Sequence, residues 1–195
     1  MGTNHISMQF VNNKTIKLDK HTSLLDDFTL KFVKYLSNFT NYVLISGYVS
    51  ILLGRSRMSE DVDIIIPPLK INDFSKFVDD ISSEFYCLNT DSKEEMFNYL
   101  SSGVAIRFAF LNQVIPNMEL KFAKTQIDFL VLEKKIDVYL GKEKLHISPL
   151  ELQIAYKEVV LKSPKDLEDA LHLRIVAEKN IDLNLIKEYK RILNE

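Results

Sequence analysis

Two aspartates that lead directly into an apolar run constrain the fold of this chain more than any other feature. Asp61 and Asp63 are followed by three isoleucines at 64–66 and by two prolines at 67–68. Proline cannot continue a sheet ladder, so this pattern predicts a short buried strand that ends before residue 67. Side chains alternate between the two faces of a strand, and both carboxylates therefore share one face.

Two carboxylates so close together need a compensating positive charge. Oxygen ligands suit Mg²⁺ or Mn²⁺, which keep several waters and take up substrate phosphates. The pair therefore favours a metal site that binds a nucleotide. A second interpretation remains open, in which Asp61 caps a turn and Asp63 pairs with Arg55 or Arg57 at the surface.

A glycine turn precedes this strand. Residues 42–46 predict a buried strand, Gly47 a turn, and residues 48–54 a short helix ended by Gly54. The free N–H groups at the start of a helix, together with the Ser46 hydroxyl, are suited to holding a phosphate. We expect this phosphate cradle and the carboxylate pair to meet at one edge of a sheet.

The rest of the chain alternates helical and strand patterns. Apolar spacing and capping signals predict helices over residues 23–38, 73–85 and 92–101, and helices beginning near residues 148, 163 and 182. Apolar and alternating runs predict strands over residues 103–111, 118–123, 126–134, 135–140 and 141–147. We predict an α+β fold, a mixed sheet with flanking helices, with a core over residues 8–147 and a helical C-terminal segment over residues 148–195 packed on it.

Composition limits the partners and the cellular compartment that we expect for this chain. The net charge of −2 and the pI near 6.1 provide no overall basic surface, so a nucleic-acid partner would need a local patch. Cys87 is the only cysteine, which excludes an intrachain disulfide and a thiolate zinc site and fits the cytoplasm. No apolar stretch approaches the roughly 20 residues of a membrane helix, so no membrane is expected. Residues 1–7 precede a second methionine, Met8, and are set aside as a candidate leader.

The stretch from Leu44 to Ile66 resembles the signature of the nucleotidyltransferase fold shared with DNA polymerase β, a glycine turn followed by an Asp-x-Asp strand. It is most similar to the minimal and toxin-type AbiEii-like branch, although a serine replaces the first motif glycine. The matching positions are Ser46, Gly47, Tyr48, Val49, Arg57, Ser59, Glu60, Asp61 and Asp63. A looser match over residues 148–173 covers Lys157, Lys165, Asp166 and Asp169.

This resemblance implies transfer of a nucleoside monophosphate from an NTP to a hydroxyl of RNA, protein or a small molecule. The roles that it implies include the toxin of a toxin–antitoxin pair, with a cognate antitoxin protein as partner. Members hold Mg²⁺ or Mn²⁺ with three carboxylates on neighbouring strands. Asp128 is favoured as the third over Asp137, whose flanking lysines could satisfy it. The predicted catalytic and metal residues are Asp61, Asp63 and Asp128, and the predicted nucleotide-binding residues are Ser46, Gly47, Arg57, Ser59 and Lys157.

Several assignments keep two interpretations. Lys157 either contacts phosphate or lies on the solvated face of its helix. Arg107 either pairs with a phosphate or carboxylate or extends to the sheet edge. Asp166 and Asp169 are most simply explained as acids that complement a helix dipole. Because Ser46 replaces a glycine, a noncatalytic nucleotide-binding, regulatory or partner-binding domain of the same fold is the alternative function.

Overall fold

The computed structural model describes residues 7–194, and the chain divides into two compact units. Unit 1 takes in the chain up to residue 21, residues 45–57, and the chain from residue 134 onward. Unit 2 takes in residues 22–44 and 58–133. Residues 1–6 of the candidate leader lie outside the described part, whereas Ser7 already begins a strand.

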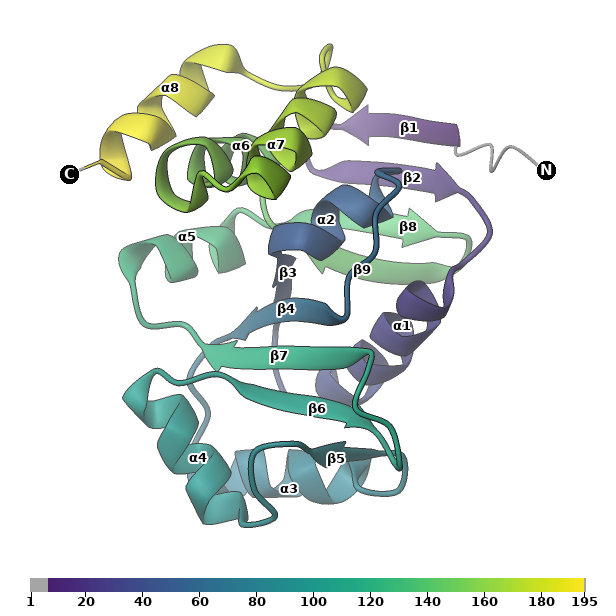
Figure 1. The fold of residues 1–195 in the computed structure, drawn as a ribbon, viewed down its shortest axis with the longest axis vertical. Coiled ribbons are helices and arrows are strands. Elements are labelled where there is room, and N and C mark those ends of the chain that lie inside the picture. Colours follow the sequence, from purple (N-terminus) through teal and green to yellow (C-terminus); the bar gives the residue numbers. More distant parts are fainter. Residues whose placement is uncertain (1–6, 195) are drawn as a thin grey trace. The chain divides into compact units, whose positions relative to one another are not determined.

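Unit 1 is a mixed sheet covered by helices (Figure 1). Its elements are β1 (Ser7–Asn12), β2 (Thr15–Asp19), α2 (Ser46–Leu52), β8 (Ile136–Leu140), β9 (Glu143–Ile147), α6 (Leu150–Tyr156), the π-helical segment η1 (Lys157–Leu161), α7 (Pro164–Val176) and α8 (Leu183–Ile192). β2 pairs with β1 in antiparallel and with β8 in parallel orientation, and β8 pairs with β9 in antiparallel orientation.

Capping residues fix where the C-terminal helices begin. The Ser163 hydroxyl accepts a hydrogen bond from the N–H of Asp166, with Pro164 in the first turn of α7. The Asp182 carboxylate accepts from two N–H groups at the start of α8. Both helices begin where the sequence predicted. In each, the capping side chain satisfies N–H groups that have no partner within the helix.

Unit 2 combines parallel and antiparallel strands with helices packed on them (Figure 1). Its elements are α1 (Leu24–Leu36), β4 (Asp61–Ile66), α3 (Ile71–Ile81), β5 (Phe85–Cys87), α4 (Lys93–Ser102), β6 (Ile106–Phe110), β7 (Asn117–Phe122) and α5 (Gln126–Glu133), while β3 (Val43–Ile45) lies at the boundary with unit 1. β4 and β7 are parallel, and β7, β6 and β5 follow in antiparallel order.

Aromatic side chains form the core of unit 2. Phe32 of α1 is fully buried, and its ring centroid lies 5.3 Å from that of Phe85 and 5.7 Å from that of Phe108. The ring centroid of Phe77 on α3 lies 5.9 Å from that of Phe32. Such edge-on and tilted pairs add to the burial of apolar area, so the core-facing side of the sheet is fixed and the polar side of β4 points the other way.

The predicted α+β architecture, a mixed sheet with flanking helices, is confirmed. Three local predictions were wrong. Residues 126–133 form helix α5 and not a strand. Helix α3 ends at Ile81, before the predicted residue 85, and strand β5 begins at Phe85. Strands β1 and β2 were not predicted. The β1–β2 hairpin escaped notice because its alternation is short and mostly polar on its exposed side.

Each unit is built from segments that are separate in the sequence, and the division into residues 8–147 and 148–195 stays a prediction. Helices α6, α7 and α8 group with β1, β2, β8 and β9 in unit 1, whereas the Asp-x-Asp strand belongs to unit 2. Among the helices of residues 7–194, none combines the length and the apolar character that crossing a membrane requires.

Candidate functional site

An acidic face lies on two neighbouring parallel strands of unit 2. In the β4–β7 register, Asp61 is opposite Asn117 and Asp63 is opposite Glu119. Neighbouring strands lie about 4.8 Å apart, and residues paired across parallel strands project to the same side. Asp61, Asp63 and Glu119 therefore share one side of the sheet, while Val62 and Met118 point into the core. We call these three carboxylates the acidic face.

Arg107 on β6 offsets part of this negative charge. It pairs with Glu119 across the β6–β7 ladder, and its Nε and Nη2 lie 3.0 and 2.9 Å from Glu119 Oε2. The Arg107 side chain is 55% exposed and that of Glu119 is 24% exposed. Of the two interpretations of Arg107, the pairing with a carboxylate is the one that the structure shows.

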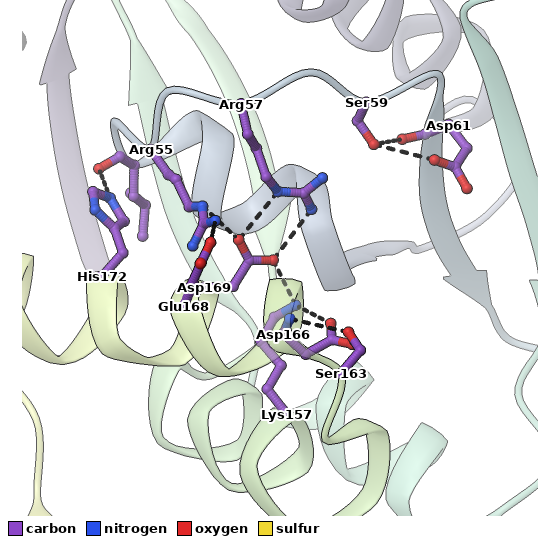
Figure 2. Close-up of polar contacts among 11 residues, drawn as sticks. Arg55, Arg57, Ser59, Asp61, Lys157, Ser163, Asp166, Glu168, Asp169 and His172 are labelled. Carbon is purple, nitrogen blue, oxygen red and sulfur yellow. Dashed lines mark hydrogen bonds and ion pairs between the residues drawn. The ribbon is translucent and has the colours of Figure 1, made fainter.

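Ser59 and Asp61 form a local turn at the entrance to β4. The Ser59 hydroxyl donates to Asp61 Oδ1 at 3.1 Å and lies 3.2 Å from the Asp61 carbonyl oxygen (Figure 2). Asp61 is exposed and Asp63 is partly exposed. The short contact ties Ser59 to the acidic face, so any ligand at Asp61 is also near the serine hydroxyl.

Asp128 does not lie on a strand, and the premise for choosing it as the third carboxylate was wrong. Its Oδ2 accepts from the N–H groups of Lys124 and Thr125 at 2.9 and 2.8 Å, while the Thr125 hydroxyl accepts from the N–H of Asp128 at 3.1 Å. This reciprocal pair is a capping box, which explains why an apolar stretch that resembles a strand forms α5 instead. Glu119 takes the place of Asp128 as the third candidate carboxylate.

Asp137, the other candidate considered, makes ordinary polar contacts in unit 1. Its Oδ1 lies 2.7 Å from His146 Nδ1, and its Oδ2 lies 3.5 Å from Lys144 Nζ. Burial and the nearby Lys135 charge outweigh Asp137 and hold the pKa of His146 below its ordinary value. Asp137 thus has the lysine partner that the sequence suggested.

The fit of this chain to a divalent cation can be tested on these side chains. The acidic face supplies only oxygen donors, as Mg²⁺ and Mn²⁺ prefer. However, no three Asp, Glu, His or Cys side chains within residues 7–194 come close enough together to hold a metal ion. The donor chemistry suits a metal, but the three carboxylates are not assembled around one point, and one of them is bound to an arginine.

Unit 1 contains a second polar group, which we call the Asp169 cluster: Asp169, Asp166, Arg55, Arg57 and Lys157. The Asp169 side chain is fully buried on α7 and contacts three cations (Figure 2). Its Oδ1 lies 3.0 Å from Arg55 Nε and 3.1 Å from Arg57 Nε, and its Oδ2 lies 3.1 Å from Arg57 Nη2 and 2.9 Å from Lys157 Nζ.

Lys157 is fully buried, which contradicts one of its two interpretations, the one that placed it on a solvated helix face. Its ammonium group contacts Asp169 and lies 3.1 Å from Asp166 Oδ1. It opens η1, a π-helical segment of the kind often found at functional sites. Asp166 does lie in the first turn of α7, as its dipole role requires, whereas Asp169 is an ion-pair residue.

Arg57 also explains why residue 47 is a glycine. A Cβ atom built on Gly47 would lie 2.0 Å from Arg57 Nη2, well inside van der Waals contact. The guanidinium therefore rests directly on the Gly47 backbone, and the same Nη2 donates to Asp169 Oδ2. Ser46 has a φ of 63°, in the left-handed region that favours glycine, which fits the glycine of the family motif at this position.

The predicted residues thus fall into two groups. Within unit 1 the structure brings Gly47, Arg57 and Lys157 to the Asp169 cluster, with Ser46 next to Gly47 in the chain. Within unit 2 it brings Ser59, Asp61 and Asp63 to one strand and its entrance. Sequence reasoning missed Glu119 and the ion-pair role of Asp169. The acid between two apolar residues in "MEL" was the available signal for Glu119, because it follows the same alternation as the Asp-x-Asp strand.

Comparison with known proteins identifies the fold. No protein-family model and no curated protein matches this chain. The chain is similar in structure to an antigenic nucleotidyltransferase-like protein from Paracoccidioides brasiliensis, with a TM-score of 0.53 and 14% sequence identity, over 86% of this chain and 85% of that one. This chain therefore has a nucleotidyltransferase-like fold.

Proposed function

We propose that this protein is a nucleotidyltransferase that transfers a nucleoside monophosphate from an NTP to a hydroxyl group. The observation that carries the proposal is the register of β4 and β7, which gives Asp61, Asp63 and Glu119 one shared face in a nucleotidyltransferase-like fold. The acceptor is RNA, a protein or a small molecule, and a toxin role with a cognate antitoxin belongs to the same proposal.

Because the three carboxylates are not assembled around one point, Mg²⁺ or Mn²⁺ would bind through Asp61 and Asp63 only together with the phosphates of the NTP. A bound divalent cation would neutralise phosphate charge and make the acceptor hydroxyl easier to deprotonate. The Ser59 hydroxyl, bonded to Asp61, would orient that carboxylate. Arg107 lowers the repulsion among the carboxylates when no cation is bound, because it pairs with Glu119.

The assignment of Ser46, Gly47, Arg57 and Lys157 in unit 1 to phosphate binding stays a proposal that is separate from the acidic face. Of the two cations, Arg57 is the one that a phosphate could reach, because Lys157 is fully buried. Asp169 holds the Arg57 guanidinium in a fixed position, which would reduce the entropy lost on binding. Arginine with fixed geometry is suited to bidentate contacts with phosphate oxygens.

A second candidate function is a noncatalytic nucleotide-binding, regulatory or partner-binding domain. One observation favours it: the Arg57 guanidinium covers the Gly47 backbone that the sequence assigned to phosphate. In this alternative the protein binds NTP through its charged groups and transfers nothing.

The experiment that separates these functions incubates the protein with each of four NTPs labelled at the α-phosphate, Mg²⁺ or Mn²⁺, and a cell lysate, and searches for labelled products. We expect transfer by the wild type and its loss in Asp61→Asn/Asp63→Asn. Asp73→Asn, which changes an exposed aspartate on α3, is the matched control and should keep activity. NTP binding without any labelled product, unchanged by Ser46→Gly, would support the second candidate.

A further inference from the structure

The strands of unit 1 have a buried side and a solvent-facing side. Ile16 on β2 is opposite Val138 on β8, which is opposite Leu145 on β9, and all three side chains are buried. Side chains alternate between the two faces of a strand, so the next residue along each strand points the other way. These next residues define the solvent-facing side.

A row of polar and aromatic side chains crosses that side. Lys17 on β2 is opposite Tyr139 on β8, and Tyr139 is opposite Lys144 on β9. On the first strand, β1, Gln9 is opposite Lys17. Gln9, Lys17 and Lys144 are exposed, and Tyr139 is partly exposed. We call these four residues the lysine–tyrosine row, in which the tyrosine has a lysine on each neighbouring strand.

Positive charge is in excess around this row. On this side of β2, β8 and β9 and at the start of β8, Lys17, Lys135 and Lys144 face the carboxylates of Asp19 and Asp137. Burial, together with the Lys144 charge, lowers the pKa of Lys135, although Asp137 opposes the shift. Two neighbouring ammonium groups thus share one carboxylate, and an anion bound beside them would relieve their repulsion.

The lysines of the row can contact such an anion. Lys144 Nζ lies 3.5 Å from Asp137 Oδ2, and its side chain is 43% exposed. An ammonium group has three N–H donors, so Lys144 can bind a second oxygen while it keeps this contact. Neighbouring strands lie about 4.8 Å apart, which places the two lysines on opposite sides of Tyr139 and within reach of one ligand.

The chemistry of the row fits single-stranded RNA. An accessible aromatic ring stacks on an unpaired base, and lysines beside the ring bind the backbone phosphates. A duplex keeps its bases stacked on one another, and an acidic peptide has no base, so either would use the lysines and leave Tyr139 without a role. The Gln9 amide both donates and accepts hydrogen bonds, which suits the 2′-hydroxyl that distinguishes RNA from DNA.

We propose that the lysine–tyrosine row binds single-stranded RNA, with a base stacked on Tyr139 and the neighbouring phosphates bound by Lys17 and Lys144. The proposal does not depend on the proposed function, because this binding needs neither NTP nor a divalent cation. A local patch of this kind is what a chain with a net charge of −2 requires for a nucleic-acid partner.

The test measures the fluorescence anisotropy of labelled oligouridine at several salt concentrations, with EDTA and without NTP. Tyr139→Leu should weaken binding about tenfold because it removes the stacking surface, whereas Tyr139→Phe keeps that surface and should bind like the wild type. Lys17→Gln and Lys144→Gln should each reduce the steepness of the salt dependence by about 0.7, the value for one phosphate contact of a single strand. Lys187→Gln changes an exposed lysine on α8 and is the matched control, which should alter neither quantity.

Three further probes distinguish the other possible occupants. We expect a blunt RNA duplex and oligothymidine to bind more weakly than oligouridine, and polyglutamate at matched charge not to displace it. Wild type that does not bind oligouridine, duplex or oligothymidine bound as tightly, or displacement by polyglutamate would overturn the proposal. So would a Tyr139→Leu variant that binds like the wild type.

Circular dichroism establishes that each variant is folded. If Tyr139→Leu does not fold, the two lysine variants still decide, because they change only exposed side chains. A salt dependence as steep in both of them as in the wild type would overturn the proposal as well.

Discussion

The two polar regions of this protein handle charge in opposite ways. In the Asp169 cluster of unit 1 a fully buried carboxylate is surrounded by Arg55, Arg57 and Lys157. In the acidic face of unit 2 three carboxylates lie side by side on accessible strands, and Arg107 pairs with one of them. The charges of the Asp169 cluster neutralise one another within the fold, whereas the acidic face has an excess of negative charge at the surface.

This difference separates a structural requirement from a binding property. Removing one partner from a buried ion pair leaves an uncompensated charge, which is far more costly than the loss of an exposed pair. The Asp169 cluster should therefore be needed for the folding of unit 1, whereas the acidic face should tolerate substitution and lose only what it binds. Four predictions test this contrast.

The largest effect is expected for Asp169→Ala. The change would leave Arg57 and Lys157 without their shared buried carboxylate, and we expect a loss of about 3–5 kcal/mol in the free energy of unfolding. Urea unfolding followed by circular dichroism measures it. A loss under about 1 kcal/mol would mean that the cluster is solvated and that the contrast between the two regions does not hold.

A smaller loss is expected for Gly47→Ala. The new methyl group would collide with Arg57 Nη2, and the guanidinium is held in place by Asp169, so the collision cannot be relieved freely. We expect a loss of about 1–3 kcal/mol, in the range of overpacked interiors. The same substitution in an Arg57→Ala background is the control, where most of the loss should disappear. Equal losses in both backgrounds would show that Arg57 is not the obstacle.

The pH dependence of stability provides the third test. Burial raises the pKa of Asp166, but hydrogen bonds from Ser163 and Lys157 outweigh it and hold that pKa below its ordinary value. Such a carboxyl group has a lower pKa in the folded state than in the unfolded state, where it is about 3.9. Its contribution to stability is fully present at pH values above the unfolded-state pKa and is lost as the pH falls through the folded-state pKa.

We therefore expect wild type to exceed Asp166→Asn in stability at pH 6, and the difference to shrink below about pH 4. Unfolding midpoints of the two proteins at several pH values measure this convergence. A difference that stays constant down to pH 2 would assign the effect of Asp166 to its shape and not to its charge.

The smallest effect is expected for Glu119→Gln. The change removes an accessible ion pair with Arg107 but also relieves repulsion from Asp63, and exposed pairs contribute about 0–1 kcal/mol. We expect a change within about 0.5 kcal/mol in the absence of metal, measured with EDTA present. Arg107→Gln is the matched control. It should lower the free energy of unfolding more than Glu119→Gln does, because it leaves Glu119 without its arginine partner.

The sequence predicted the elements whose signals are local. The Asp-x-Asp strand that stops at two prolines, the capping serines of α1, α4 and α7, and the hairpin of β8 and β9 are all in place. Each depends on contacts between residues a few positions apart. The carboxylate pair on one side of β4 follows from the same local alternation.

The errors concern residues whose role depends on distant partners or on a competing local signal. Asp128 was placed on a strand because its neighbours are apolar, but the capping box with Thr125 outweighs that composition. Lys157 belongs to a helical pattern that does not reveal burial, since its partner Asp169 comes from the next helix. Glu119 required knowledge that β7 lies beside β4.

The division of the chain into units also has a consequence for the order in which the protein folds during synthesis. Strand β2 pairs in parallel with β8, so Thr15 cannot pair with Asp137 until Asp137 has left the ribosome. Unit 2 is complete once residue 133 has emerged, whereas unit 1 also needs α7 to cover the arginines of residues 55–57. Until α7 emerges, Arg57 lacks Asp169, and a ribosome-bound chain that ends before α7 should show a protease-resistant unit 2 and a cleavable unit 1.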